Sequence, residues 1–112
     1  MNFVSADYVN IDDALKRVGG NFELYKKLLE RFVDGSHVTA LEGFLADGNI
    51  TDASRLVHTL KGVAANLSLT KLAESAAQME GTIKGGADYI PALEDLKTSN
   101  DITAQIISDI IA

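Results

Sequence analysis

The segment from Thr51 to Leu67 contains the side chain with the clearest chemical potential in this sequence, the imidazole of His58. Its apolar residues recur at helical spacing, and on a helical wheel His58 lies about 160° from Leu60, the centre of the apolar face. We therefore predict that His58 lies on the outer face of a helix, in water. An exposed imidazole titrates near neutral pH and can act as a nucleophile or as a metal ligand.

Small residues are prominent around His58 on this predicted outer face. The five neighbours are Ser54, Arg55, Lys61, Gly62 and Ala65. Glycine inside a helix costs about 0.5–1 kcal/mol relative to alanine, so Gly62 suggests room for a partner's backbone or for a bulky group on the ring. Tight packing of Gly62 against another helix is the alternative. The Lys61 ammonium, one turn away, favours the neutral, nucleophilic ring and attracts an anion attached to it.

Three other chemistries fit these residues poorly. A metal site needs His, Asp or Glu one turn from His58, and none stands there. A hydrolase that uses His58 and Ser54 is the least favoured function, because an exposed helix face offers no evident oxyanion hole or cleft. The glycine pairs at 19–20 and 85–86 lack the pattern of a phosphate-binding loop. A phosphoryl group would therefore have to arrive on another protein.

Composition narrows the class of protein further. Ten Lys and Arg against sixteen Asp and Glu give a net charge of −6, which argues against binding to nucleic acid or to anionic lipid. The absence of Cys excludes disulfides and thiolate chemistry. We find no basic stretch leading into an apolar run at the amino end and no segment near the roughly 20 apolar residues of a membrane helix. We expect a single domain over residues 1–112 that is cytoplasmic and monomeric.

Asparagine caps and glycine pairs divide the first half of the chain into two predicted helices. Asn10 caps a short helix, with Asp13 as the partner in a capping box, and Gly19-Gly20 ends it. A long helix follows from the cap Asn21 to Asp47-Gly48-Asn49, with a weak point at Gly35-Ser36. Its predicted apolar stripe is Phe22, Tyr25, Leu29, Phe32, Leu41, Phe44 and Leu45.

Three more helices are predicted at about residues 51–67, about 70–84, and from near 88 to the end. Pro91 fits the first turn of the last helix, and Ser99-Asn100-Asp101 is a candidate interruption in it. Short connections favour antiparallel neighbours, so we predict an all-α fold, an up-and-down antiparallel four-helix bundle with a short extra N-terminal helix. The predicted core faces are Ala53, Leu56, Val57, Leu60, Val63, Ala64 and Leu67, and then Leu72, Ala76, Met79 and Ile83.

The run His58-Thr59-Leu60-Lys61-Gly62, followed by residues 63–67, resembles the signature of histidine-containing phosphotransfer (HPt) domains of two-component phosphorelays. Residues 19–32 resemble the region that precedes this signature, so the likeness covers essentially the whole chain. The resemblance implies a histidine that takes a phosphoryl group from an aspartyl phosphate on a receiver domain and passes it to another receiver. By position it implies that His58 is the acceptor, that Lys61 steadies the phosphate and that Gly62 keeps the approach clear. Ser54, Arg55 and Ala65 would line the docking face.

Two positions depart from the family's pattern. Ser68 stands where the family often has Gly, so the end of the helix is expected to differ slightly. Glu80 stands near the place where some members have a glutamine beside the histidine, and we assign it no role because a carboxylate would oppose phosphate. His37 is also given no role.

The function expected is therefore that of a phosphocarrier, without a kinase activity or nucleotide site of its own and without a cofactor. Its partners would be receiver domains of response regulators or of hybrid histidine kinases. Mg²⁺ is expected on the receiver, whose acidic cluster can bind it. The alternative is a helical-bundle adaptor that docks receivers or another protein without carrying phosphate.

Overall fold

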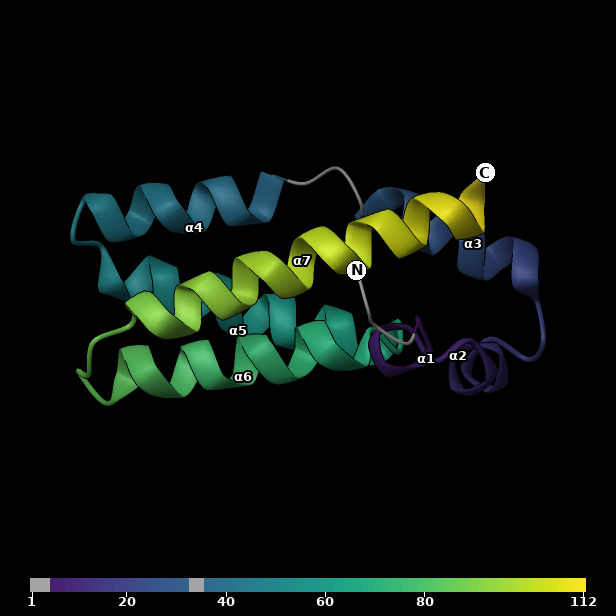
Figure 1. Ribbon diagram of the computed structural model, residues 1–112, viewed down its shortest axis with the longest axis horizontal. Coiled ribbons are helices and arrows are strands. Elements are labelled where there is room, and N and C mark those ends of the chain that lie inside the picture. The colour runs from purple at the N-terminus through teal and green to yellow at the C-terminus, as the bar shows by residue number, and fades with distance from the viewer. Residues whose placement is uncertain (1–4, 33–35) are drawn as a thin grey trace.

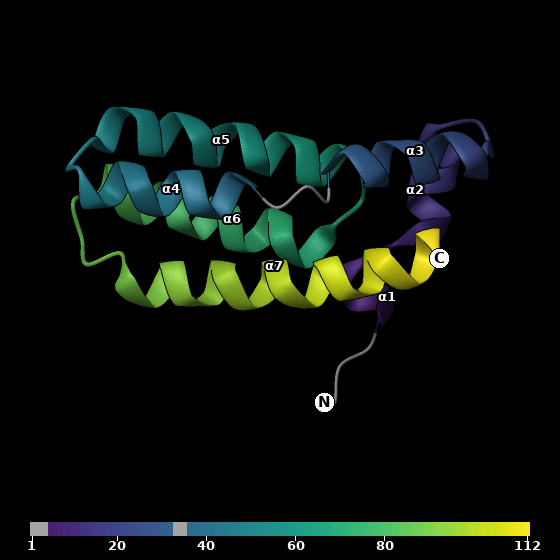
Figure 2. The same cartoon turned by 90° about the horizontal axis from the view of Figure 1, so that it is seen from above.

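The computed structural model describes residues 5–32 and 36–112, and in that part of the chain helices are joined by short turns and loops, with no strand. Figures 1 and 2 show the arrangement of its helices. The predicted all-α class is confirmed. The helices are α1 Ser5–Tyr8, α2 Ile11–Arg17, α3 Phe22–Phe32, α4 Ser36–Ala46, α5 Ile50–Asn66, α6 Thr70–Lys84 and α7 Ile90–Ile111.

The helices form an elongated up-and-down bundle of about 41 × 28 × 21 Å. The chain runs along the long axis in α3 and α4, returns in α5, runs forward again in α6 and returns in α7 (Figures 1 and 2). α5 packs against both α4 and α6, and α7 packs against α6 and α3. The two short helices α1 and α2 lie at the end where α5 ends and α6 begins. None of the described helices is both long enough and apolar enough to cross a membrane.

The first half of the bundle differs from the prediction in how it is divided. The one long helix predicted from residue 21 to the turn at residue 47 is two helices, α3 and α4, and two short helices precede them instead of one. Of the predicted weak point, Ser36 begins α4, whereas Gly35 lies outside the described residues.

Side-chain caps begin the helices where asparagine predicted them. The Asn10 Oδ1 accepts the Asp13 N–H at 3.1 Å, and the Asn21 Oδ1 accepts the Leu24 N–H at 3.0 Å. The reciprocal half of the predicted capping box is wrong. The backbone N–H of Asn10 donates to the Ser68 carbonyl at 3.0 Å, and the Asp13 carboxylate binds Ser68 and Arg17 instead.

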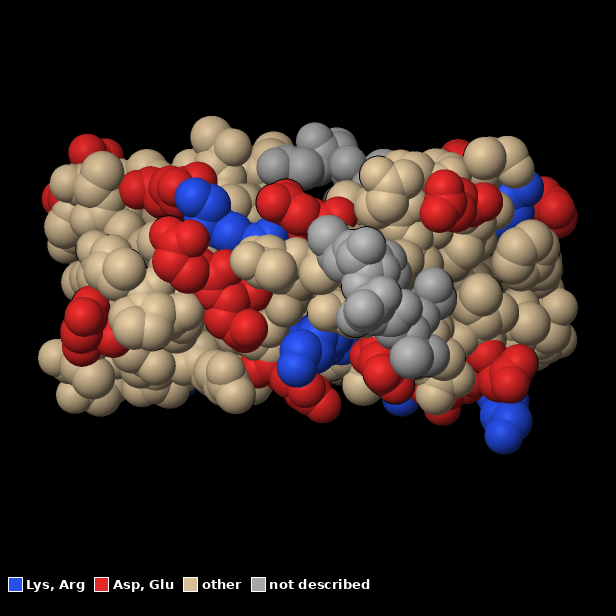
Figure 3. Space-filling model, viewed as in Figure 1, with Lys and Arg blue, Asp and Glu red and all other residues tan. Residues whose placement is uncertain are grey.

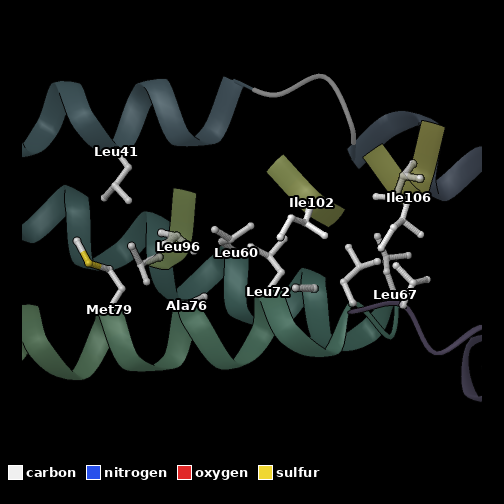
Figure 4. Close-up of a cluster of buried hydrophobic side chains, with 14 of the residues drawn as sticks. Leu41, Leu60, Leu67, Leu72, Ala76, Met79, Leu96, Ile102 and Ile106 are labelled. Carbon is white, nitrogen blue, oxygen red and sulfur yellow. The ribbon is translucent and has the colours of Figure 1, made fainter. Parts of the chain in front are cut away.

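The core lies where the helix faces meet, and most of the predicted stripe residues are in it (Figure 4). Phe22 and Val63 are each 39% exposed, contrary to prediction. Phe22 is the first residue of α3, and Lys26 Nζ lies over its ring, 5.8 Å from the ring centre. Val63 lies at the edge of the apolar face of α5 and lines a groove together with Leu28 and Phe32. Leu56, Phe32 and Phe44 pack against the core but are only partly buried.

Helix α7 is continuous, so the interruption predicted at residues 99–101 is wrong. The polar side chains there bind neighbouring helices instead of breaking their own. The buried Ser99 hydroxyl lies 2.7 Å from the Ser75 hydroxyl of α6, and the Asn100 side chain is hydrogen-bonded to the His37 Nε2 of α4 at 2.8 Å.

The turn after α5 ties the amino end of the chain to the bundle. Ser68 adopts the left-handed backbone conformation, with φ of 57°, which glycine adopts without strain. Its hydroxyl donates to Asp13 at 2.6 Å, and the hydroxyl of the buried Tyr25 donates to the Leu67 carbonyl at 2.8 Å. Burial raises the pKa of Tyr25 to about 12. The departure at Ser68 therefore keeps a glycine-like conformation and adds a contact to α2.

Candidate functional site

Packing of α5 determines where His58 lies. Ala53, Val57, Leu60 and Ala64 bury one face of α5 against its neighbours, and this fixes the rotation of the helix about its axis. His58 consequently lies outside the core, and its side chain is 66% exposed. The predicted exposure of the imidazole is confirmed.

The ring is held from the neighbouring helix by Glu80 of α6. The Nδ1 of His58 lies 2.8 Å from the Glu80 Oε2, and the Lys61 ammonium donates to the Glu80 Oε1 at 2.8 Å. Lys84, also on α6, places its Nζ 3.1 Å from Oε2. The Glu80 side chain is only 7% exposed. One nearly buried carboxylate therefore binds an imidazole and two ammonium groups.

These contacts keep Glu80 ionised. The hydrogen bond from Lys61 is the largest cause that lowers the pKa of Glu80, and the hydrogen bonds from Lys84 and His58 add to it. Desolvation acts in the opposite direction, and the net result is a pKa of about 2.

The ionised carboxylate assigns the proton on the imidazole. Because a carboxylate without its proton only accepts hydrogen bonds, Nδ1 of His58 must be the donor to Glu80. In the neutral ring the lone pair then lies on Nε2. Nε2 has no hydrogen-bond partner among the residues that the structure describes. The site thus has a nucleophilic nitrogen on an exposed side chain, and the hydrogen bond from Nδ1 to Glu80 fixes the orientation of the ring.

The space beside the ring is open at Gly62. Apart from the backbone of its own helix and its chain neighbours, a Cβ built on Gly62 meets no atom of the described residues within 4 Å, so the alternative that this glycine permits close helix packing is wrong. Of the other predicted neighbours, Ala65 is exposed, Ser54 is half-buried, and the Arg55 side chain is 76% exposed with its guanidinium 3.5 Å from Asp52. All of these residues lie on α5 within two helical turns of His58.

The sequence reasoning missed Glu80 and Lys84. It set Glu80 aside because a carboxylate opposes phosphate, but Lys61 and Lys84 balance that charge. It also directed the Lys61 ammonium toward the ring, whereas this group binds Glu80. Only the antiparallel packing of α5 and α6 brings residues 58 and 80 together. The spacing of four residues between Glu80 and Lys84 was the one signal available in the sequence.

Comparison with known proteins identifies the family. The chain matches the model described as Hpt domain over residues 27–105. The search of curated proteins and the search of solved structures gave no significant match. The matched region includes α5 and α6, the helices that carry His58 and Glu80. This chain therefore belongs to the Hpt domain family, phosphocarrier modules that carry out histidine phosphotransfer in phosphorelays and interact with receiver domains.

Proposed function

We propose that this protein carries a phosphoryl group on Nε2 of His58, taking it from the aspartyl phosphate of one receiver domain and passing it to the aspartate of another. The observation that carries the proposal is the hydrogen bond between Nδ1 and the ionised Glu80, which leaves Nε2 on an exposed side chain without a hydrogen-bond partner in the described part of the chain. A nucleophile needs an available lone pair and a fixed orientation, and this arrangement supplies both.

The transfer of the phosphoryl group requires no gain or loss of a proton by the imidazole ring. The Nε2 lone pair forms the bond to phosphorus, while the phosphorus–oxygen bond to the receiver's aspartate breaks and leaves its electron pair on that carboxylate. The ring keeps its Nδ1 proton and becomes positively charged. The Glu80 carboxylate, 2.8 Å from Nδ1, offsets this charge. Donation to the second receiver reverses the same steps.

Lys61 and Gly62 have separate parts in this proposal. Lys61 lies one helical turn from His58 and is 37% exposed, so its long side chain can turn from Glu80 to the oxygens of the phosphoryl group. Gly62 leaves space for the receiver to approach the ring. Ser54, Arg55 and Ala65 form the surrounding docking face. Mg²⁺ is held by the receiver's acidic residues.

The wider expectations stay part of the proposal: a single domain over residues 1–112 that works as a cytoplasmic monomer. Receiver domains are the partners, and nucleic acid is not. The surface charge supports the expectation that nucleic acid is not a partner. Figure 3 shows a face on which acidic side chains outnumber basic ones, and the net charge is −6. Such a surface repels a phosphate backbone.

Labelling by a phosphorylated receiver tests the proposal. The protein is incubated with a receiver domain that carries labelled aspartyl phosphate and Mg²⁺. We expect an acid-labile label that is absent from His58→Gln and unchanged in His37→Gln, because His37 is the other of the two histidines in the chain. Nitrogen-15 NMR of the product should place phosphorus on Nε2.

Two results would contradict the proposal. Label that persists in His58→Gln would move the acceptor elsewhere. Docking of the receiver without any label would favour the alternative function, an adaptor that binds receivers without carrying phosphate.

A further inference from the structure

Glu80 binds two ammonium groups that come from different helices. Lys61 reaches Oε1 from α5, and Lys84 reaches Oε2 from α6, one turn after Glu80 itself. The contact of Lys84 therefore lies within one helix, whereas the contact of Lys61 crosses between two. Lys84 is 63% exposed and Lys61 is 37% exposed.

A phosphoryl group on Nε2 adds negative charge that a nearby ammonium group must balance. It brings roughly two negative charges to a ring whose nearest ammonium on the same helix is Lys61. If Lys61 turns toward the phosphoryl oxygens, Glu80 loses the partner that contributes most to its low pKa. A carboxylate that is only 7% exposed is costly to leave without a counter-ion.

We propose that Lys84 is a positioning residue that stays on Glu80 when Lys61 turns to the phosphoryl group, so that Glu80 remains ionised and keeps its hydrogen bond with Nδ1 of His58. This inference rests on the proposed function of His58. Lys84 thereby frees Lys61 to neutralise the group in transfer. It acts through Glu80 and does not touch the phosphoryl group.

The geometry supports the assignment of Lys84 to Glu80 and of Lys61 to the phosphoryl group. Lys84 approaches Oε2, the same carboxylate oxygen that faces Nδ1. Nδ1 and Nε2 are separate ring nitrogens, so the Lys84 ammonium contacts the carboxylate oxygen that binds the nitrogen that does not react. Lys61 occupies the other oxygen and can leave without breaking the contact at Nδ1.

Labelling with phosphoramidate tests the inference without a docked partner. In this reaction the Nε2 lone pair bonds to phosphorus while the donor's phosphorus–nitrogen bond breaks and its electron pair leaves on ammonia. We expect Lys84→Met to slow labelling of His58 roughly fivefold at constant ionic strength, the upper range for an exposed ion pair. Lys84→Arg should restore the rate, because a guanidinium also binds a carboxylate.

Lys71→Met is the matched control. Lys71 lies on the same helix as Lys84, about 14 Å along α6 from Glu80, and pairs with Glu74 at 3.9 Å. Replacing Lys71 with Met removes the same charge as Lys84→Met. The Lys71→Met protein should be labelled at the rate of the unmodified protein. A Lys84→Met rate equal to that of Lys71→Met would overturn the inference.

A double-mutant cycle separates action through Glu80 from a direct contact with phosphate. In the Glu80→Gln background there is no carboxylate charge to balance, so adding Lys84→Met should leave the rate unchanged. A further loss of rate in that background would overturn the inference, because Lys84 would then act on the phosphoryl group. Failure of the unmodified protein to label at His58 would overturn the proposed function and this inference with it.

Discussion

Replacing Glu80 with glutamine removes one negative charge and keeps an oxygen that can accept the Nδ1–H. The pKa of Glu80 falls from its ordinary value of 4.5 to about 2, with the Lys61 hydrogen bond as the largest cause. The full difference corresponds to roughly 3 kcal/mol. Lys61 and Lys84 are 37% and 63% exposed, and water screens both. We therefore expect Glu80→Gln to lower the free energy of unfolding by about 1–2 kcal/mol near neutral pH.

The effect should depend on pH in a defined direction. Because the pKa of Glu80 is lower in the folded state than in the unfolded chain, the ionised carboxylate stabilises the fold fully above about pH 4.5. This stabilisation is lost as the pH falls from about 4.5 toward about 2. Glutamine does not titrate, so the difference in unfolding free energy between the two proteins should shrink over that range.

Urea unfolding followed by circular dichroism, at several pH values from about 7 down to about 2.5, measures the difference. Glu74→Gln is the matched control, because Glu74 lies on the same helix, is 63% exposed and pairs with Lys71 at 3.9 Å. It should change the stability by less than about 0.5 kcal/mol. A Glu80→Gln loss that is equally large at both ends of the pH range would refute the assignment of an ionised Glu80, as would a loss no greater than the control's.

Three further outcomes follow from the structure. Gly62→Gln should keep the free energy of unfolding or raise it by up to about 1 kcal/mol, because no described residue outside its own stretch of helix lies within 4 Å of its Cβ position. It should nevertheless slow labelling by a phosphorylated receiver, and unaltered transfer kinetics would refute its role in access. Ser68→Ala should lower the melting temperature more than Ser68→Gly, because both lose the bond to Asp13 but glycine relieves the strain of the left-handed conformation; the opposite order in calorimetry would contradict this. Thr103→Val should raise the unfolding free energy by about 1 kcal/mol, because the buried Thr103 hydroxyl has no hydrogen-bond partner among residues 5–32 and 36–112; destabilisation in urea would show that the hydroxyl is satisfied.

Local rules acting along the chain were enough to predict most of the helices. Apolar residues at helical spacing identified the core faces of α5 and α6, and the caps at Asn10 and Asn21 formed as expected, because each depends on contacts within a few residues. The exposure of His58 was predictable for the same reason. The predictions were wrong where a side chain binds a residue that is distant in the sequence. The sequence makes residues 99–101 a candidate interruption of the last helix, but the Ser99 hydroxyl binds Ser75 across the helix interface and α7 is continuous.

The helical class and the outward position of His58 could therefore be predicted from the residues alone, because both follow from the periodicity of a single helix. At Gly62 the sequence left two alternatives, room for a partner or close helix packing, and the space beside this residue in the folded bundle decided between them. Which nitrogen of the ring is available depends on a contact that forms only in the folded bundle. Glu80 is far from His58 in the sequence, and it reaches Nδ1 only because α6 packs antiparallel to α5. The ionisation of Glu80 in turn depends on cations from both helices, and their combined field exists only after the bundle has formed.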